Sequence, residues 1–121
     1  MEARVRGVSG LRNGRTGAVL ASEVSTAGTF FSRFLGLMGR RGLPDGGALY
    51  IPGCQSIHSF FMRFDFDAVF IDRDRRVVHV MHAMRPWRVG RMVWKAEGVV
   101  ELPAGVAAAT DTQPGDILEF A

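Results

Sequence analysis

Short apolar segments separated by turn residues dominate the chain, and they predict strands rather than long helices. Residues 2–7 alternate between apolar and arginine positions, which is typical of a strand with one solvated face. Further segments with the length and apolar content of strands lie at 17–24, 48–51, 56–62, 66–71, 76–81, 98–102 and 117–120. Asn13 and Gly14 form a tight-turn signal, so we expect the first two strands to make an opening hairpin. The charged turn at 72–75 predicts a second hairpin.

One segment has the period of an amphipathic helix. Its apolar residues recur at spacings of three and four, and they are Phe30, Phe31, Phe34, Leu35, Leu37 and Met38. Ser25 or Thr26 can cap its start, and Gly42 and Pro44 end it. A short helical turn is also predicted over 106–110. The pattern therefore predicts a mainly β fold, a single sandwich-like or barrel-like domain of about eight short strands with one amphipathic helix.

The composition fits one domain. The chain has 121 residues, of which 47% are hydrophobic and 22% charged, enough to bury a core. No linker or repeat divides it, so we expect a single domain over 1–121. The net charge is +3, and Lys95 is the only lysine among 15 basic residues. Because the arginines are scattered rather than gathered in one stripe, we do not expect a nucleic-acid partner.

The distribution of cysteine and apolar residues indicates a compartment. Cys54 is the only cysteine, so no intramolecular disulfide can form and a reducing cytoplasm is compatible. The N-terminus has no apolar run of the signal-peptide kind, and no stretch is long enough to span a membrane. We expect a soluble, cytoplasmic protein. The sequence does not specify its oligomeric state.

Five blocks of residues, in this order, resemble those of a small bacterial and archaeal family known as domain of unknown function 192. They are RFLGLMGR at 33–40, IHSFFMRF at 57–64 with DAVFID at 67–72, RPW at 85–87, VELPAG at 100–105 and GD at 115–116. The resemblance covers 19–120 and implies a compact, mainly β fold, but no activity, metal or cofactor. We expect this chain to be an intracellular, bacterial representative, because it lacks the signal peptide of exported members.

Candidate binding residues lie in two segments that otherwise have the composition of a core. They are His58, Met62, Arg63, Arg85, Trp87 and Arg88. Guanidinium forks beside an indole plane suit a small, planar or sugar-like anionic ligand, with the histidine orienting it by a hydrogen bond. The residues from Arg85 to Arg88 form a predicted loop, where function is common.

Structural roles for the same residues stay open. His58 can instead be a hydrogen-bonded core histidine, and Arg63 can pair with Asp67 or Glu101. Four residues have metal-ligand chemistry, namely Cys54, His58, His79 and His82. Residues three apart on a strand face opposite sides, so the last two converge only if a bulge lies between them. We predict no metal and no cofactor.

Three functions follow from this reading. The leading hypothesis is a non-catalytic binding or accessory module with its groove near His58, Arg63, Arg85 and Trp87. The first alternative is a small hydrolase-like enzyme that uses His58 with Cys54 or Asp67, although the chain has no nucleophile elbow and no phosphate-binding glycine loop. The second alternative is a protein-interaction module of a cell-envelope or secretion assembly, which requires an exposed apolar patch.

Overall fold

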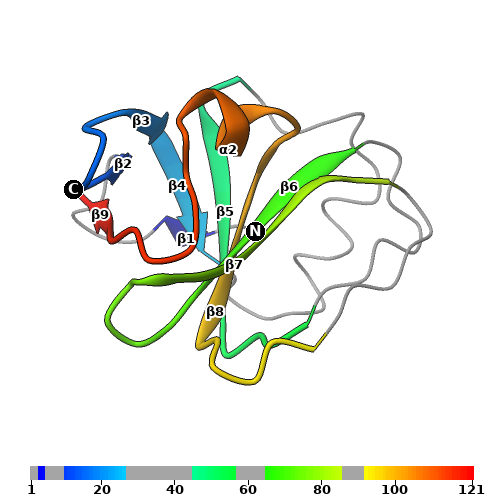
Figure 1. The fold of residues 1–121 in the computed structure, drawn as a ribbon. Coiled ribbons are helices and arrows are strands. Elements are labelled where there is room, and N and C mark those ends of the chain that lie inside the picture. The colour runs from blue at the N-terminus through cyan, green and yellow to red at the C-terminus, as the bar shows by residue number, and fades with distance from the viewer. Residues whose placement is uncertain (1–2, 5–9, 27–44, 57–64, 86–91) are drawn as a thin grey trace.

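Two β-sheets and one short helix make up the part of the protein that the computed structural model describes, residues 3–4, 10–26, 45–56, 65–85 and 92–121. The larger sheet has six strands in the order β1-β4-β5-β8-β6-β7, and the smaller has three in the order β3-β2-β9 (Figure 1). The larger sheet comprises β1 (Ala3–Arg4), β4 (Glu23–Thr26), β5 (Gly47–Pro52), β8 (Gly98–Pro103), β6 (Phe66–Ile71) and β7 (Val77–Met84). The smaller comprises β3 (Val19–Ala21), β2 (Leu11–Asn13) and β9 (Leu118–Phe120), and the helix is α2 (Val106–Ala109).

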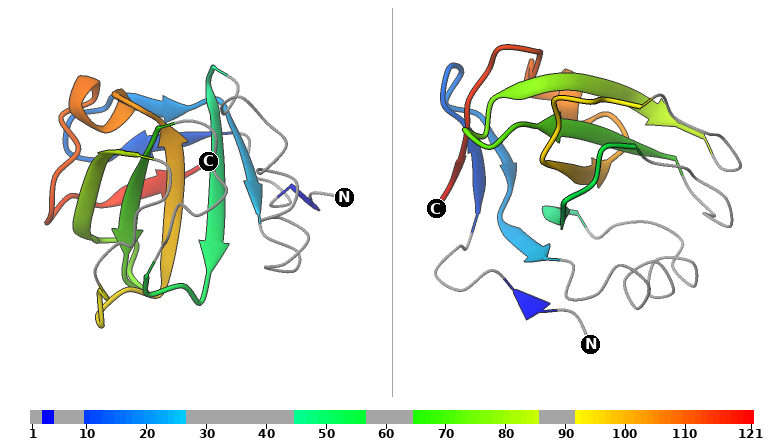
Figure 2. Two further views of the ribbon diagram at one scale, coloured as in Figure 1. Left: turned by 90° about the vertical axis from the view of Figure 1, so that its right-hand side faces the viewer. Right: turned by 90° about the horizontal axis from the view of Figure 1, so that it is seen from below.

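The expected mainly β fold is confirmed. All strand pairs are antiparallel except β4 with β5, which run parallel. The two views in Figure 2 show the smaller sheet standing beside the larger one, with α2 over the end of the larger sheet. The predicted helical turn at 106–110 corresponds to α2. The amphipathic helix expected from Phe30 to Met38 lies outside the described residues, as do most of the strand at 56–62 and the loop that begins at Pro86.

One core fills the space between the two sheets. Alternate residues of the larger sheet point into it, among them Val24, Val69 and Val100, and they meet Leu11 and Leu118 of the smaller sheet. Ala107 of α2 joins the same core. Burial of this apolar surface holds the two layers together, because each sheet alone would leave one apolar face in water.

A second apolar cluster covers the opposite face of the larger sheet. It contains Leu49, Phe66, Phe70 and Val99 from the strands, together with Val93 and Ala96 from the loop before β8, and we call this side the outer face. Because both faces of the sheet are covered, every residue of β6 is buried. Burial on both faces explains the apolar run from Ala68 to Ile71 in that strand in place of an alternating pattern.

Two expectations for the N-terminal part are wrong. The segment 17–24 is not one strand, because the chain bends at Ser22 and passes from β3 in the smaller sheet to β4 in the larger. The N–H groups of Ser22 and Glu23 both donate to the carbonyl of Gly46, at 2.8 and 3.1 Å, which holds this bend. The opening hairpin across Asn13 and Gly14 joins β2 to β3, whereas β1 pairs with β4.

The later strands agree with the pattern. Four of the predicted segments, 48–51, 66–71, 98–102 and 117–120, correspond to β5, β6, β8 and β9 within one or two residues at each end. The charged turn at 72–75 joins β6 to β7, and β7 continues three residues beyond the predicted end at Met81. That extension carries the strand to Met84, which is buried against the outer face.

Candidate functional site

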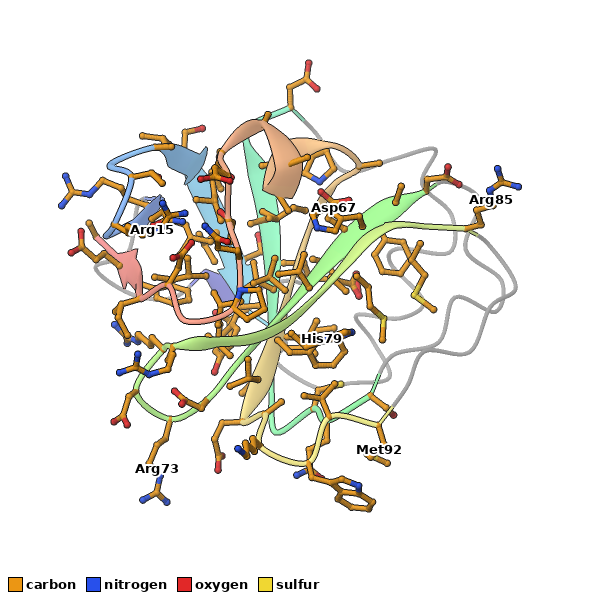
Figure 3. The ribbon with its side chains drawn as sticks, in the orientation of Figure 1. Arg15, Asp67, Arg73, His79, Arg85 and Met92 are labelled. Carbon is orange, nitrogen blue, oxygen red and sulfur yellow. The ribbon has the colours of Figure 1, made fainter. Side chains whose placement is uncertain are left out.

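Of the six candidate binding residues, the structure describes Arg85. It follows directly on β7, is exposed, and lies at the end of the β6–β7 hairpin (Figure 3). The other five, His58, Met62, Arg63, Trp87 and Arg88, belong to the segments 57–64 and 86–91, which lie outside the described residues.

The described residues that flank these two segments are neighbours at both ends. At one end, Phe66 of β6 is paired with Met84 of β7, so Asp65 and Arg85 leave the hairpin together. At the other end, the Val93 N–H donates to the Gln55 carbonyl at 2.7 Å. The Gln55 side chain donates in turn through Nε2 to the Trp94 carbonyl at 2.8 Å. Both segments therefore connect the same two places in the fold.

The outer face carries one buried carboxylate. Glu101 on β8 lies between Leu49 of β5 and Ala68 of β6 in the ladder and is 3% exposed. It is close enough to Cys54 for its charge to favour the protonated thiol. Burial of a carboxylate is rare outside ion pairs and functional sites, which makes Glu101 the main polar residue among the described residues of this face. In the sequence, Glu101 stands between the apolar residues Val100 and Leu102. No other feature of the pattern indicates that it is buried.

Cys54 has the properties of a structural thiol. Burial raises its pKa above the ordinary value, and the charge of Glu101 raises it further. The thiol donates to the Ser56 carbonyl, with 2.7 Å between Sγ and the oxygen. Because the thiolate is the nucleophilic form, a raised pKa reduces the reactivity of Cys54 at neutral pH.

Asp67 lies at the start of β6, is completely buried, and receives three backbone N–H groups. The Ala83 N–H donates to Oδ1 at 2.7 Å, whereas Gly105 and Ala107 donate to Oδ2 at 3.1 and 2.9 Å. These donors come from the end of β7 and from the start of α2, so the carboxylate joins two distant segments. A carboxylate occupied in this way stabilises the backbone and is poorly placed to act as a base.

The two described histidines do not converge. His79 packs against Phe70, with ring centroids 5.9 Å apart, on the outer face. His82 is exposed, and strand alternation places it on the opposite side. The bulges of β7 lie at Val78 and at residues 82–83, so none separates these histidines in the required way. Within the ranges that the structure describes, no three His, Cys, Asp or Glu side chains lie close enough to hold a metal ion.

A second polar cluster, which the pattern did not reveal, ties the β2–β3 turn to the loop before β9. Asp116 is 4% exposed and accepts from Nε of Arg15 at 2.6 Å and from Nδ2 of Asn13 at 2.9 Å. These bonds lower the pKa of Asp116 from 3.8 to about 2, and the bond from Arg15 is the largest cause. Asp116 is 101 residues from Arg15 and 103 from Asn13 in the chain, so no local signal could identify the cluster.

The exposed loop before β8 is the other feature that the sequence analysis missed. Trp94 is 75% exposed and Met92 is 43% exposed, although both side chains are large and apolar. Their neighbours Val93 and Ala96 are buried in the cluster of the outer face and anchor the loop. Figure 3 shows Met92 below Arg85, on the same side of the view.

Comparison with known proteins identifies similar chains of archaeal and bacterial origin. The sequence profile of the DUF192 family (Uncharacterized ACR, COG1430) matches residues 11–120. A UPF0127 protein from Thermococcus sibiricus is 34% identical over 114 residues, which covers 91% of this chain and 73% of that protein. A UPF0127 protein from Pyrococcus furiosus is 32% identical over 109 residues, covering 86% of this chain and 91% of that protein.

Two crystal structures share the fold. A protein of unknown function from Novosphingobium aromaticivorans aligns with a TM-score of 0.77 at 22% identity, over 99% of this chain and 93% of that one. A putative transcription regulator from Sinorhizobium meliloti aligns with a TM-score of 0.77 at 20% identity, over 98% and 95%. The expectation of a bacterial protein is too narrow, because the sequence relatives are archaeal. In the described part of the chain, no helix has the length and apolarity needed to cross a bilayer.

Proposed function

This chain belongs to the DUF192 family, and on that premise we propose that it is a non-catalytic binding domain for a small anionic ligand. The binding groove lies near the end of the β6–β7 hairpin. Arg85, Arg63 and Arg88 hold the anionic group, Trp87 stacks on a planar or sugar-like part of the ligand, and His58 orients it by a hydrogen bond. Met62 contributes apolar contact beside them.

The arrangement of the flanking residues carries this proposal. The pairing of Phe66 with Met84 and the hydrogen bond from Val93 to Gln55 give both site-bearing segments common starting and ending points. The two segments are short, since eight residues, for example, span at most about 28 Å. Residues 57–64 and 86–91 are therefore candidates for the two walls of one groove.

The chemistry of the described residues favours binding over catalysis. The hydrolase alternative needs Cys54 or Asp67 as the partner of His58. Burial raises the pKa of the Cys54 thiol, and the Asp67 carboxylate already accepts three backbone N–H groups. Neither group has the environment of an activated nucleophile or of a general base.

Exposed apolar residues support a role in protein interaction as a second candidate. Trp94 and Met92 are exposed on an anchored loop, which is unusual for side chains of this size. A partner protein that covers them, for example in a cell-envelope or secretion assembly, would bury both. Replacing Trp94 by Ser should then abolish co-purification of the partner without changing the melting temperature.

We further place the protein in the cytoplasm. Its single cysteine offers no intramolecular disulfide partner, and its half-buried thiol is compatible with a reducing compartment. Cell fractionation with an antibody to the chain tests this location. Recovery in the exported or membrane fraction would contradict it.

The binding proposal is tested by nuclear magnetic resonance with three probes of the expected chemistry: inorganic phosphate, benzoate and glucose 6-phosphate. At about 10 mM, a probe with a Kd near 1 mM occupies most sites, and we expect shifts at the Arg85 amide and the Trp87 indole. Native mass spectrometry of the purified protein shows in parallel whether a tighter ligand is already bound.

Matched variants locate the site. The double variant Arg85→Ala with Trp87→Phe should show no probe-induced shift at any backbone amide and keep its melting temperature. The control, Arg73→Ala with Trp94→Phe, changes the same residue types outside the candidate site and should keep the shifts. Absence of a shift with all three probes, or shifts that persist in the first variant, would overturn the proposal. Unfolding of the first variant would instead assign these residues a structural role and also refute the site.

A further inference from the structure

The end of the β6–β7 hairpin contains a β-bulge opposite Asp67. Phe66 is paired with Met84 and Ala68 with Met81, so Asp67 alone faces the two residues His82 and Ala83. Ala83 has a positive φ of 47°, which an alanine rarely adopts. Such a conformation persists when neighbouring contacts impose it.

The Asp67 carboxylate supplies those contacts. Its Oδ1 accepts the Ala83 N–H at 2.7 Å, which holds the strained residue in place. Its Oδ2 accepts from Gly105 and Ala107, so the bulge is fastened to the turn that begins α2. Full burial of Asp67 keeps water from competing for these bonds.

The bulge determines the face of the sheet to which each side chain after it points. Met81 packs on the outer face, so regular alternation would turn Met84 away from that face and Arg85 toward it. The extra residue reverses this order. Met84 is buried on the outer face beside Phe66, and Arg85 follows it as an exposed residue. If alternation continues past Met84, the Arg85 side chain is directed away from the face that carries the buried Glu101.

We propose that Asp67 is a positioning residue for the anion-binding site, because the bulge that it holds sets the direction in which Arg85 leaves the hairpin. This inference rests on the proposed function for its ligand, but the register that it invokes is measured without any ligand. Asp67 itself makes no contact with the anion.

The first test measures the register. In Asp67→Asn, one carboxylate oxygen becomes an amide nitrogen, which cannot accept a backbone N–H. The remaining oxygen cannot serve both sides, so we expect faster hydrogen exchange either at the Ala83 amide or at the Gly105 and Ala107 amides. Loss of the Ala83 bond should abolish the nuclear Overhauser contact between Phe66 and Met84. A variant that folds, exchanges rapidly at Ala83 and keeps that contact overturns the inference, whatever it does to binding.

The second test measures benzoate affinity. In Asp67→Asn the Arg85 guanidinium should no longer be positioned to bind the benzoate carboxylate, and the affinity for benzoate should fall about tenfold. Val69→Ala, which truncates a neighbouring buried residue of β6, serves as the control of comparable thermal destabilisation and should bind benzoate normally. Equal weakening in both variants would show that Asp67 acts only through stability. Failure of the wild-type protein to bind benzoate would refute the proposed function and leave the register test intact.

Two variants of Ala83 keep the proposal falsifiable if Asp67→Asn does not fold. Glycine adopts positive φ without strain, so Ala83→Gly combined with Asp67→Asn should restore the Phe66–Met84 contact and most of the affinity. Valine is strongly disfavoured at positive φ, so Ala83→Val should disturb the contact and weaken binding while Asp67 is intact. Because Ala83 is exposed, the valine itself has room. Normal benzoate affinity in Ala83→Val would overturn the inference.

Discussion

Arg15 donates through Nε to Oδ1 of Asp116 at 2.6 Å and thereby joins the β2–β3 turn to the loop that leads into β9. The carboxylate is 4% exposed, whereas the arginine side chain is 45% exposed, so the pair has one buried and one solvated member. A second oxygen of Asp116 accepts from Asn13 at 2.9 Å and from the Gln113 N–H at 3.0 Å. The cluster therefore holds the β2–β3 turn against the loop before β9, and its hydrogen bonds depend on the ionised carboxylate of Asp116.

This dependence predicts acid sensitivity. The pKa of Asp116 is lowered from 3.8 to about 2 in the folded protein, so the unfolded state binds a proton first as the pH falls. The stabilisation is complete above pH 4 or so and is lost as the pH falls through about 2. Asp116→Asn should unfold with less dependence on pH across this window, as measured by urea denaturation.

At neutral pH the same substitution should lower the free energy of unfolding by about 1–3 kcal/mol, because buried hydrogen-bond partners lose their acceptor. Asp74→Asn changes an exposed aspartate in the β6–β7 turn and serves as the control. If both variants show the same loss and the same pH profile, the bond between Arg15 and Asp116 has no special role in stability.

Ala83→Gly should stabilise the protein or leave it unchanged. Ala83 has φ of 47°, and relief of the left-handed conformation gains about 1 kcal/mol, offset by the greater backbone entropy of glycine in the unfolded chain. Ala68→Gly, at a buried and extended position of β6, should destabilise instead. Thermal melting of the two variants gives the comparison, and a lower melting temperature for Ala83→Gly than for Ala68→Gly would contradict it.

Gly98→Ala should destabilise the larger sheet by several kcal/mol. A methyl group there would lie 2.7 Å from Cε1 of Tyr50 and 2.9 Å from the carbonyl oxygen of Ile51, so the backbone of β5 would have to move. Gly17→Ala is the comparison, because φ of 75° strains an alanine there although no other atom lies within 4 Å. We expect about 1 kcal/mol for Gly17→Ala from its backbone alone. Equal losses would mean that β5 yields easily.

The Cys54 thiol should react slowly. Burial raises its pKa, so the thiolate fraction at pH 7 is smaller than that of an exposed cysteine. The rate of modification by iodoacetamide in the native protein should fall below that of the urea-unfolded chain. If Cys54 reacts with iodoacetamide faster in the native protein than in the unfolded chain, the thiol is activated, and this result would support the hydrolase alternative.

Local pattern predicted those elements whose residues carry their own signal. Both faces of β6 are covered, so most of its residues are apolar, and that short apolar segment predicts a strand. The charged residues after it predict a turn. The bend at Ser22 could not be predicted, because the carbonyl that holds it belongs to Gly46. β2 was missed for a similar reason: Leu11 is its only buried apolar residue, and its partners lie in β3 and β9.

The candidate site divides in the same way. Residue chemistry made Arg85 a candidate for anion binding in a predicted loop, and the structure shows Arg85 exposed directly after β7. The role of Asp67 could not be predicted, since its donors come from residues 83, 105 and 107. Sequence reasoning offered Arg63 as its partner, whereas the described part of the chain shows a carboxylate that binds backbone.

The central place of β2 in the smaller sheet has a consequence for the protein as it emerges from the ribosome. β2 pairs with β3, which follows it closely, and with β9, which follows it by about 100 residues. Until β9 has been released from the exit tunnel, one edge of β2 has no strand beside it, and Leu11 and Leu20 lack the cover of Leu118. A nascent chain arrested before residue 118 should therefore present this apolar edge to chaperones that bind exposed apolar segments, and release of β9 should end that exposure.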